Sequence, residues 1–183
     1  MAVHVAAEEL EAGLSQILSS PADLGTVELV VRRPSEGERE VLAEGLLDVE
    51  RGLVGDDWQA RGSRQTDDGS AHPGMQLTLM NARAIALIAG ERERRALAGD
   101  QLYVDLDLSP ENLPPGARLE VGSAVVEVTE VPHTGCAKFS QRFGSAAIRF
   151  VNSPSGRALR LRGMYVRVIE PGVARPGDSI RKL

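Results

Sequence analysis

The sequence predicts a mainly β fold, a barrel-like or strongly curved sheet with several peripheral helices. Short apolar runs bounded by glycine, proline and polar residues recur along most of the 183 residues, as in β-strands that are joined by tight turns. Only a few segments have helical spacing, and they do not alternate regularly with the strands. This inventory favours a closed or curved sheet over a doubly wound parallel sheet.

Residues 1–25 are predicted to contribute an amphipathic helix that packs on the rest of the chain. Leu10, Leu14, Ile17 and Leu18 fall at i, i+4, i+7 and i+8, which is the spacing of one apolar helix face. The helix is expected to end where two serines precede Pro21. Residues 26–183 then form the main domain, because neither the length nor the composition indicates a second core.

The next fifty residues predict strands followed by a long irregular segment. The apolar runs at 26–33 and 39–52 flank the polar sequence PSEGE and are interpreted as an antiparallel strand pair. Residues 54–74 are rich in glycine, aspartate and serine, with Trp58 as the only large apolar side chain. A segment of this length without its own core is usually functional or disordered, and both interpretations remain open.

The middle of the chain predicts a strand, a helix and a second strand. MQLTLM at 75–80 has the composition of a strand, and residues 81–97 have helical spacing with Asn81 in the N-cap position. In residues 101–108 the side chains alternate, which predicts a half-buried strand. One face carries Leu102, Val104, Leu106 and Leu108, and the other carries Asp105 and Asp107.

The last third predicts two strand pairs separated by helices. Residues 117–132 are interpreted as two strands joined at Gly122-Ser123. Residues 137–163 have helical character in at least two pieces, broken at Gly144 and at residues 153–154. Residues 164–172 and 175–183 are interpreted as a final strand pair with a Pro-Gly turn.

Composition and charge exclude several classes of protein. A net charge of −5 argues against general binding to nucleic acid or to anionic membranes, because both attract proteins with surplus Lys and Arg. No apolar stretch approaches the roughly 20 residues of a spanning helix, and the acidic N-terminal segment does not resemble a signal peptide. The single cysteine forms no internal disulfide, so a reducing compartment suits the chain. We expect a cytoplasmic protein.

Positive charge is concentrated in one segment. Residues 137–169 carry seven basic residues and no acidic ones, whereas the rest of the chain has 14 basic and 26 acidic residues. One explanation is that these arginines pair with acidic residues elsewhere. The other is an anion site, in which arginine and lysine side chains bind phosphate or carboxylate.

Cys136 directly precedes this basic segment, in the sequence PHTGC. A lone cysteine is often a small buried apolar residue. A turn-rich loop, nearby cations and a following helix instead favour a reactive thiolate. His133 could orient or deprotonate the thiol, or it could bond to the backbone of the loop. A zinc site is disfavoured because one cysteine and three scattered histidines lack the clustered spacing of tetrahedral ligands.

Six segments in this order resemble the MOSC domain, which is named for the C-terminal domain of molybdenum cofactor sulfurases. The resemblance covers most of the chain from about residue 26, and its most specific part is the strand, the cysteine-containing loop and the closing segment. The six are GLVGDD (52–57), MQLTLM (75–80), LSPENL (108–113), LEVG (119–122), VVEVTEVPHTGCAKFS (125–140) and RGMYVRVIEPGVARPGD (162–178).

This resemblance implies a β-rich barrel-like fold and the molybdopterin form of the molybdenum cofactor as ligand. Cys136 is then the metal ligand or the residue that carries the sulfur of the cofactor, with His133 beside it. Candidate contacts to the cofactor are Lys138, Arg142 and Arg149 for its phosphate, and Glu111 or Asn112 in the pocket wall. The long sulfurases also contain a pyridoxal-phosphate domain, for which 183 residues leave no room, so pyridoxal phosphate is not expected.

The resemblance leaves three functions open. The first is a small molybdenum-dependent reductase of N-hydroxylated compounds, which needs a small-molecule substrate and an external electron donor. The second is a sulfur-transfer or cofactor-carrier module in which Cys136 bears a persulfide or serves a molybdenum enzyme partner. The third is a binding module with an inert thiol. The sequence does not predict the oligomeric state.

Overall fold

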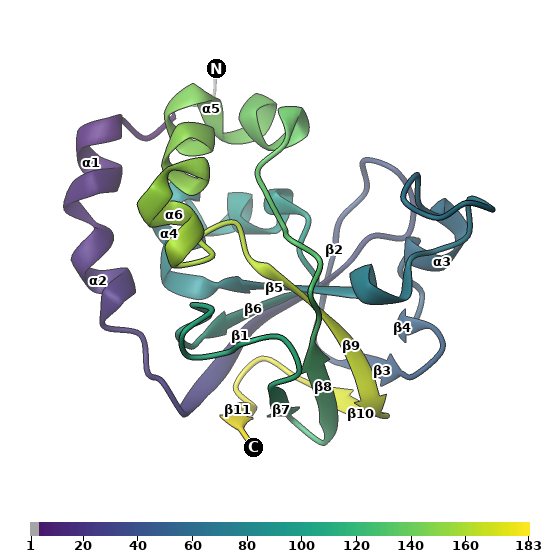
Figure 1. Cartoon of the computed structure of the whole chain (residues 1–183). Helices are drawn as coiled ribbons and strands as arrows, with labels where there is room; N and C mark the ends of the chain where they lie inside the picture. Colours follow the sequence, from purple (N-terminus) through teal and green to yellow (C-terminus); the bar gives the residue numbers. More distant parts are fainter. Residues whose placement is uncertain (1–3) are drawn as a thin grey trace.

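The computed structural model describes residues 4–183 and confirms the mainly β fold. Seven strands form a closed mixed barrel in the order β11-β7-β8-β9-β5-β6-β1, and pairing of β1 with β11 closes it (Figure 1). Neighbouring strands are antiparallel except for β5 and β6. The barrel strands are β1 (Leu24–Arg32), β5 (Leu77–Asn81), β6 (Leu102–Asp105), β7 (Arg118–Val121), β8 (Ala124–Val128), β9 (Met164–Glu170) and β11 (Ser179–Lys182).

Four shorter strands extend the barrel at one side. Strand β2 (Glu40–Leu42) pairs with β1. A small antiparallel sheet has the order β10-β3-β4. Its strands are β3 (Gly45–Asp48), β4 (Gly52–Leu53) and β10 (Gly172–Ala174).

Helices cover the opposite side and one end of the barrel (Figure 1). Helices α1, α2, α4, α5 and α6 lie on one side, and α3 lies near the short strands on the other. Their bounds are α1 (Ala7–Ala12), α2 (Leu14–Leu18), α3 (Trp58–Arg61), α4 (Ala82–Ala89), α5 (Ala137–Asn152) and α6 (Pro154–Ala158), with 3-10 turns η1 (Pro73–Met75) and η2 (Arg92–Ala98). Among residues 4–183, no helix is long and apolar enough to cross a membrane.

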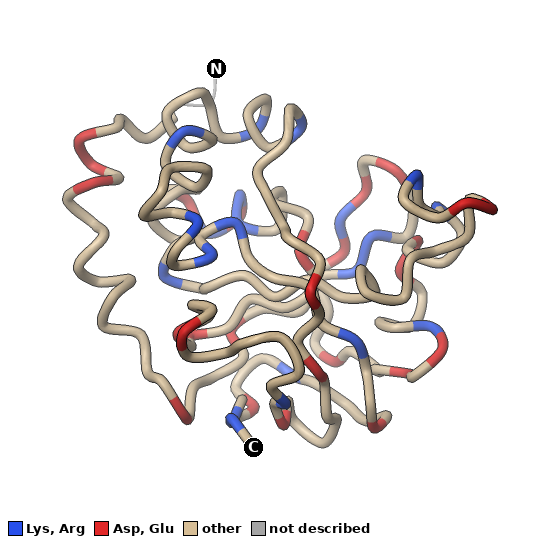
Figure 2. Tube along the Cα trace, viewed as in Figure 1, with Lys and Arg blue, Asp and Glu red and all other residues tan. Residues whose placement is uncertain are grey.

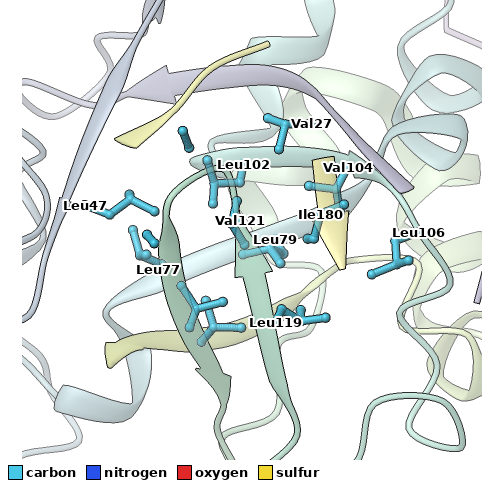
Figure 3. Close-up of a cluster of buried hydrophobic side chains, with 14 of the residues drawn as sticks. Val27, Leu47, Leu77, Leu79, Leu102, Val104, Leu106, Leu119, Val121 and Ile180 are labelled. Atoms are coloured by element: carbon cyan, nitrogen blue, oxygen red, sulfur yellow. The ribbon is translucent and has the colours of Figure 1, made fainter. Parts of the chain in front are cut away.

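The barrel interior is the larger of two apolar cores. Because side chains alternate between the two faces of a strand, every second residue of each strand points inward. Figure 3 shows these side chains meeting inside the barrel. They include Val27, Leu77, Leu79, Leu102, Val104, Leu119, Val121 and Ile180.

A second core lies between the barrel wall and the helices. Met80 of β5 and Tyr103 of β6 point outward into it, where they join Phe139 and Phe143 of α5. Leu10 of α1 and Ile17 of α2 belong to the same cluster. The wall formed by β5 and β6 is therefore buried on both faces, and α5 is held against it by aromatic packing.

Several predicted elements are confirmed. Strands β1 and β2 are antiparallel as predicted, although residues 45–48 of the predicted second strand leave β1 and join the small sheet instead. Strands β7 and β8 form a hairpin around Gly122-Ser123, and the Asn81 side chain accepts a hydrogen bond from the N–H of Ala84 at 2.9 Å. Helix α5 is kinked at Gly144, which has φ of +88°. A new helix, α6, begins after Ser153, so both predicted breaks are present.

Three elements differ from the prediction. The helix predicted over 81–97 ends at Ala89, because Gly90 adopts a φ of +70°, and residues 92–98 form a 3-10 turn instead. The N-terminal helix is divided at Gly13, where a Cβ would lie 2.6 Å from the Leu87 side chain. Leu18 was predicted on its apolar face but is exposed. Strands β9 and β11 do not pair with each other, since β10 between them joins β3 and β11 crosses to β7 and β1.

Candidate functional site

The only cysteine of the chain lies where a barrel strand is connected to α5. Residues 129–136, the cysteine loop, run from the end of β8 across the barrel to the start of α5 (Figure 1). Cys136 occupies the N-cap position of α5, and its thiol is exposed and makes no capping hydrogen bond. The side chain of Cys136 is therefore not used to build the helix or the core.

The residue before the thiol is clamped to the far end of the same helix. The N–H of Gly135 donates to Oδ1 of Asn152 at 2.9 Å, and Nδ2 of Asn152 donates to the Gly135 carbonyl at 3.2 Å. A Cβ on residue 135 would lie 3.0 Å from a methyl group of Val151. Glycine thus allows a close approach that fixes the cysteine loop against α5.

The three predicted cofactor-binding cations on α5 have different surroundings. Nζ of Lys138 pairs with Glu36 at 2.6 Å, with both side chains largely exposed. Nη1 of Arg142 donates to the carbonyl of Leu97 at 2.7 Å, so this side chain ties α5 to η2. Arg149 is exposed and has no hydrogen bond or ion pair to another residue within 4–183. Of these three cations, Arg149 is thus the one without a hydrogen bond or ion pair among residues 4–183.

Asn112 and Glu111 lie in the loop between β6 and β7. Nδ2 of Asn112 donates to the carbonyls of Ala22 and Asp107, each at 2.8 Å, and its Oδ1 accepts from Nζ of Lys182 at 3.2 Å. Glu111 is exposed. Asn112 therefore holds this loop against the two terminal segments, and none of its described hydrogen bonds goes to the cysteine loop.

Beneath the cysteine loop lies a buried ion pair that the sequence did not indicate. Nη1 of Arg162 is 2.7 Å from Oδ2 of Asp100, and both side chains are almost completely buried. Nη2 of Arg162 donates to the carbonyl of Ala98 at 3.1 Å. The guanidinium also stacks on the ring of Phe139, 4.9 Å from its centroid, so the ion pair connects α5 with the residues before β6.

His133 joins this buried pair from the cysteine loop. Its Nδ1 is 3.8 Å from Oδ1 of Asp100, and its ring lies 4.6 Å from that of Tyr165. Burial lowers the pKa of His133 well below 6.5, and the charges of Arg162 and Arg33 lower it further. The imidazole is therefore neutral near neutral pH, and its Nδ1 does not bond to the backbone of the loop.

A second buried ion pair fixes the start of the irregular segment 54–74. Arg33 binds Asp56 through two parallel hydrogen bonds, Nε to Oδ1 at 2.9 Å and Nη2 to Oδ2 at 2.6 Å. Backbone N–H groups of Arg33 and Trp58 also donate to this carboxylate, and Gln101 reaches it at 3.3 Å. The segment is thus anchored at its start, and Trp58 is buried.

The two ion pairs meet at residues 99–101. The carbonyl of Gly99 accepts from Nη1 of Arg33 at 3.2 Å, Asp100 binds Arg162, and Gln101 binds both Asp56 and Thr78. One tripeptide therefore connects the irregular segment with the cysteine loop. Sequence reasoning missed Asp56 and Asp100 because a single aspartate at the edge of a strand or turn looks like a solvated residue.

A cleft of about 300 Å³ opens on one side of the cysteine loop. Its walls are residues 129–134, the end of α5 and the segment from Gly156 to Met164. Three arginines line this arginine cleft: Arg157, Arg160 and Arg162. They belong to the acid-free basic segment, which appears in Figure 2 as blue positions without red along α5 and α6. The cleft therefore takes its arginines from the predicted basic segment, but none of the three is among the predicted cofactor contacts Lys138, Arg142 and Arg149.

The donor atoms around Cys136 are compatible with a cofactor-bound metal. Within residues 4–183, no group of three or more His, Cys, Asp and Glu side chains could hold a metal ion. The protein instead offers one exposed soft sulfur, which suits a metal that brings most of its ligands with it. Lys138 and Arg149 on α5 could neutralise an anionic cofactor.

A sequence model of the MOSC domain matches residues 56–181. This match spans more than half of the chain. The chain belongs to the MOSC domain family. MOSC domains are associated with the molybdenum cofactor. The family match confirms the resemblance that the cysteine loop and the closing segment indicated.

Solved structures support the same fold. The YuaD protein from Bacillus subtilis aligns with a TM-score of 0.64 and 16% identity, over 86% of this chain and 94% of that one. YiiM from Escherichia coli aligns with a TM-score of 0.54 and 21% identity, over 86% of this chain and 69% of that one. At these identities the likeness extends to the MOSC fold alone. A comparison with curated proteins gives no significant match.

Proposed function

We propose that this protein binds the molybdopterin form of the molybdenum cofactor and that Cys136 is the protein ligand of the molybdenum. The position of Cys136 is the observation that supports this most directly. Its thiol is exposed at the start of α5 and makes no capping bond. Thiolate sulfur is a preferred ligand of soft transition metals. A side chain without a structural task remains available for coordination.

The cations of α5 have separate tasks in this proposal. Arg149 has no protein partner within residues 4–183 and contacts the anionic part of the cofactor. Lys138 does the same after leaving Glu36, because an exposed ion pair contributes only about 0–1 kcal/mol. Arg142 acts indirectly, since its bond to Leu97 fixes α5 and hence Cys136. Glu111 and Asn112 remain candidates for the outer pocket wall.

The reaction that we propose is reduction of N-hydroxylated compounds. Bound molybdenum cofactor supplies two-electron redox chemistry. Conversion of an N-hydroxyl compound to the amine consumes two electrons and two protons and releases water. An external donor protein supplies the electrons, since one cysteine cannot ligate an iron–sulfur cluster of its own. This requirement makes a redox partner part of the proposal.

His133 is the candidate group for moving a proton in this reaction. Its imidazole is neutral, because burial and the charges of Arg162 and Arg33 lower its pKa. A neutral imidazole carries a proton on one ring nitrogen and accepts at the other. His133 also lines the arginine cleft, so the histidine can exchange protons with a molecule bound there.

A second candidate function is sulfur transfer or cofactor delivery. The exposure of Cys136 favours it, because a persulfide must be reachable by a second protein. In this case the Cys136 thiolate attacks the sulfane sulfur of a donor persulfide and releases the donor thiol, and the resulting Cys136 persulfide passes that sulfur to a molybdenum enzyme partner in the cytoplasm. The two functions differ in whether the isolated protein retains metal.

The test is molybdenum and pterin content after expression in a host that makes the cofactor. Wild type is compared with Cys136→Ala and with Gln141→Ala, an exposed position one turn further along α5. We expect near-stoichiometric molybdenum and oxidisable pterin in wild type and in Gln141→Ala. Cys136→Ala should lose molybdenum and keep its fold, because replacing an exposed loop thiol removes little packing.

Other outcomes identify the alternatives. Absence of metal and pterin from wild type, in a host that loads a second molybdenum enzyme, contradicts the proposal. Sulfane sulfur on wild type but not on Cys136→Ala would then support sulfur transfer. An unfolded Cys136→Ala protein, judged by circular dichroism, would show a structural cysteine instead.

A further inference from the structure

The arginine cleft carries more positive charge than its own acidic group neutralises. Arg162 is paired with Asp100 beneath it, whereas Arg157 and Arg160 have no carboxylate partner among residues 4–183. Glu130 is the acidic residue among those that line the cleft, and it is exposed. Two unmatched guanidinium groups therefore face one solvated carboxylate.

Arg160 is held in place at a structural cost. Its φ of +48° is the only left-handed backbone among the non-glycine residues described, a conformation that costs about 1–2 kcal/mol. Nη1 of Arg160 donates to the carbonyls of Leu113 at 2.7 Å and Leu108 at 3.3 Å. These bonds fix the guanidinium at the cleft wall. Burial lowers its pKa, so a bound anion would replace the solvation that its charge has lost.

The floor of the cleft contains a buried donor without an acceptor. Arg162 is only 6% exposed, lines the cleft, and its Nε has no hydrogen-bond partner among the residues described. Buried polar atoms in folded proteins are nearly always satisfied, by protein, by water or by a ligand. This atom therefore indicates an acceptor that the protein chain itself does not supply.

We propose that the arginine cleft is a binding site for the phosphate group of a small molecule, held by Arg157 and Arg160 above Arg162. Guanidinium groups bind phosphate oxygens through paired N–H donors, and two unmatched cations suit a dianion better than a monovalent carboxylate. The volume of about 300 Å³ is that of a small-ligand site. Cys136 is not among its lining residues, so phosphate binding needs no molybdenum.

The phosphate could belong to the cofactor or to a phosphorylated substrate. Both molecules present a phosphate group to the same arginines, so the cleft geometry predicts the chemical group that binds and not the molecule that carries it. The experiment therefore begins with the full chain from a host that does not make the cofactor. Its result is then independent of whether Cys136 binds molybdenum, so failure of the proposed function leaves this inference intact.

The test is calorimetric titration of this protein with inorganic phosphate, and with acetate as the carboxylate probe. We expect saturable binding of phosphate at one site, tighter than that of acetate. Arg157→Gln should weaken phosphate binding at least about tenfold, the lower end for a charged hydrogen bond. Arg157 is exposed, so this variant should fold. Glu130→Gln should tighten phosphate binding, because it removes a repelling charge.

Arg64→Gln is the matched control, since Arg64 is an exposed arginine in the segment after α3, outside the cleft. Its phosphate affinity should equal that of wild type. The proposal is overturned if Arg157→Gln binds phosphate as tightly as wild type, or if Arg157→Gln and Arg64→Gln lose phosphate affinity equally. It is also overturned if wild type binds acetate as tightly as phosphate. Repeating the titration on cofactor-loaded protein separates the two sources of the phosphate group. If added phosphate no longer binds, the phosphate of the cofactor occupies the cleft. If added phosphate still binds, the cleft serves a phosphorylated substrate.

Discussion

Nδ1 of His133 lies 3.8 Å from Oδ1 of Asp100, and neither atom has a hydrogen-bond partner among the residues described. The distance is about 1 Å longer than a hydrogen bond. A small inward movement of the cysteine loop would close it, with the imidazole proton on Nδ1. The buried aspartate thus connects the histidine of the cysteine loop to Arg162, which is bound to the other oxygen of the same carboxylate.

We predict that His133 makes the protein less stable in mild acid. Its pKa is lowered in the folded state by burial and by the charges of Arg162 and Arg33, while Asp100 and Tyr165 are its other neighbours. A lowered folded-state pKa means that the unfolded chain binds the proton first. The contribution of neutral His133 to the free energy of unfolding is complete above pH 6.5. It decreases as pH falls below that value.

Urea unfolding of wild type and His133→Asn at a series of pH values measures this effect. The stability difference between the two should fall with a slope of up to about 1.4 kcal/mol per pH unit below 6.5. A difference that is constant across this range would mean that folding does not lower the pKa of His133.

We predict strong coupling between Asp100 and Arg162. Removing one partner of a buried ion pair leaves an uncompensated charge and costs about 3–5 kcal/mol. Asp100→Asn and Arg162→Met should each reach this range, and the double variant should be less destabilised than the sum of the two. A thermodynamic cycle of unfolding free energies measures the coupling. Additive losses would show that the 2.7 Å contact contributes nothing net.

We predict that the Asp56 carboxylate stabilises the folded protein fully at pH values above 3.8 and less at lower pH. Burial acts to raise the pKa of Asp56, but the hydrogen bond and the charge of Arg33 and two backbone N–H groups hold it below 3.8. The contribution of the carboxylate is therefore complete above 3.8 and is lost as pH falls through the lowered folded-state pKa. Asp56→Asn should cost about 3–5 kcal/mol near neutral pH and progressively less only as pH falls below 3.8.

Unfolding of wild type and Asp56→Asn at neutral and acidic pH provides the comparison. Limited proteolysis gives an independent readout, because the clamp also fixes the start of residues 54–74. Faster cleavage within 59–72 in Asp56→Asn is expected. Unchanged cleavage would show that Trp58, which is buried, holds this segment without the ion pair.

We predict that Cys136 of the native protein reacts readily with a small alkylating reagent. It is the only cysteine of the chain and is exposed, so the rate reports this one side chain. The native rate should lie within about tenfold of the rate in urea, because exposure governs access to the thiol. A much slower native reaction would favour the inert thiol and argue against both metal ligation and sulfur transfer.

The local pattern predicted most elements because each depends on near neighbours in the chain. Asn81 caps its helix through a bond to Ala84, three residues away, and Gly144 breaks α5 by its own backbone conformation. The predicted pairing of residues 164–172 with 175–183 was wrong because pairing depends on distant strands. Residues 172–174 pair with residues 45–47 instead, and β11 pairs with β1 and β7.

Some residues of the candidate site could be predicted from the sequence, and others could be recognised only in the structure. The sequence drew attention to Cys136, to His133 and to the basic segment, because their residue types and order are visible without a structure. It did not show that Arg142 is bonded to Leu97 or that Asn112 is bonded to Ala22. Nor could it select Arg157 and Arg160 among the seven basic residues of residues 137–169, because which side of a helix or loop faces a cleft depends on packing.

Residue order and spacing are enough to predict a β-rich fold, the MOSC family and one candidate thiol. These follow from short-range alternation, from turn residues and from an ordered set of motifs. Which charges are buried depends on how distant segments pack. Asp56 and Asp100 lie 44 residues apart in the chain, yet the Arg33–Asp56 and Arg162–Asp100 pairs meet at residues 99–101. The strand order β9-β5-β6-β1 brings the ends of β1 and β6 and the segment before β9 together. A buried charge is stable only when it is paired, and the local sequence around Asp56 and Asp100 does not show that either residue is buried.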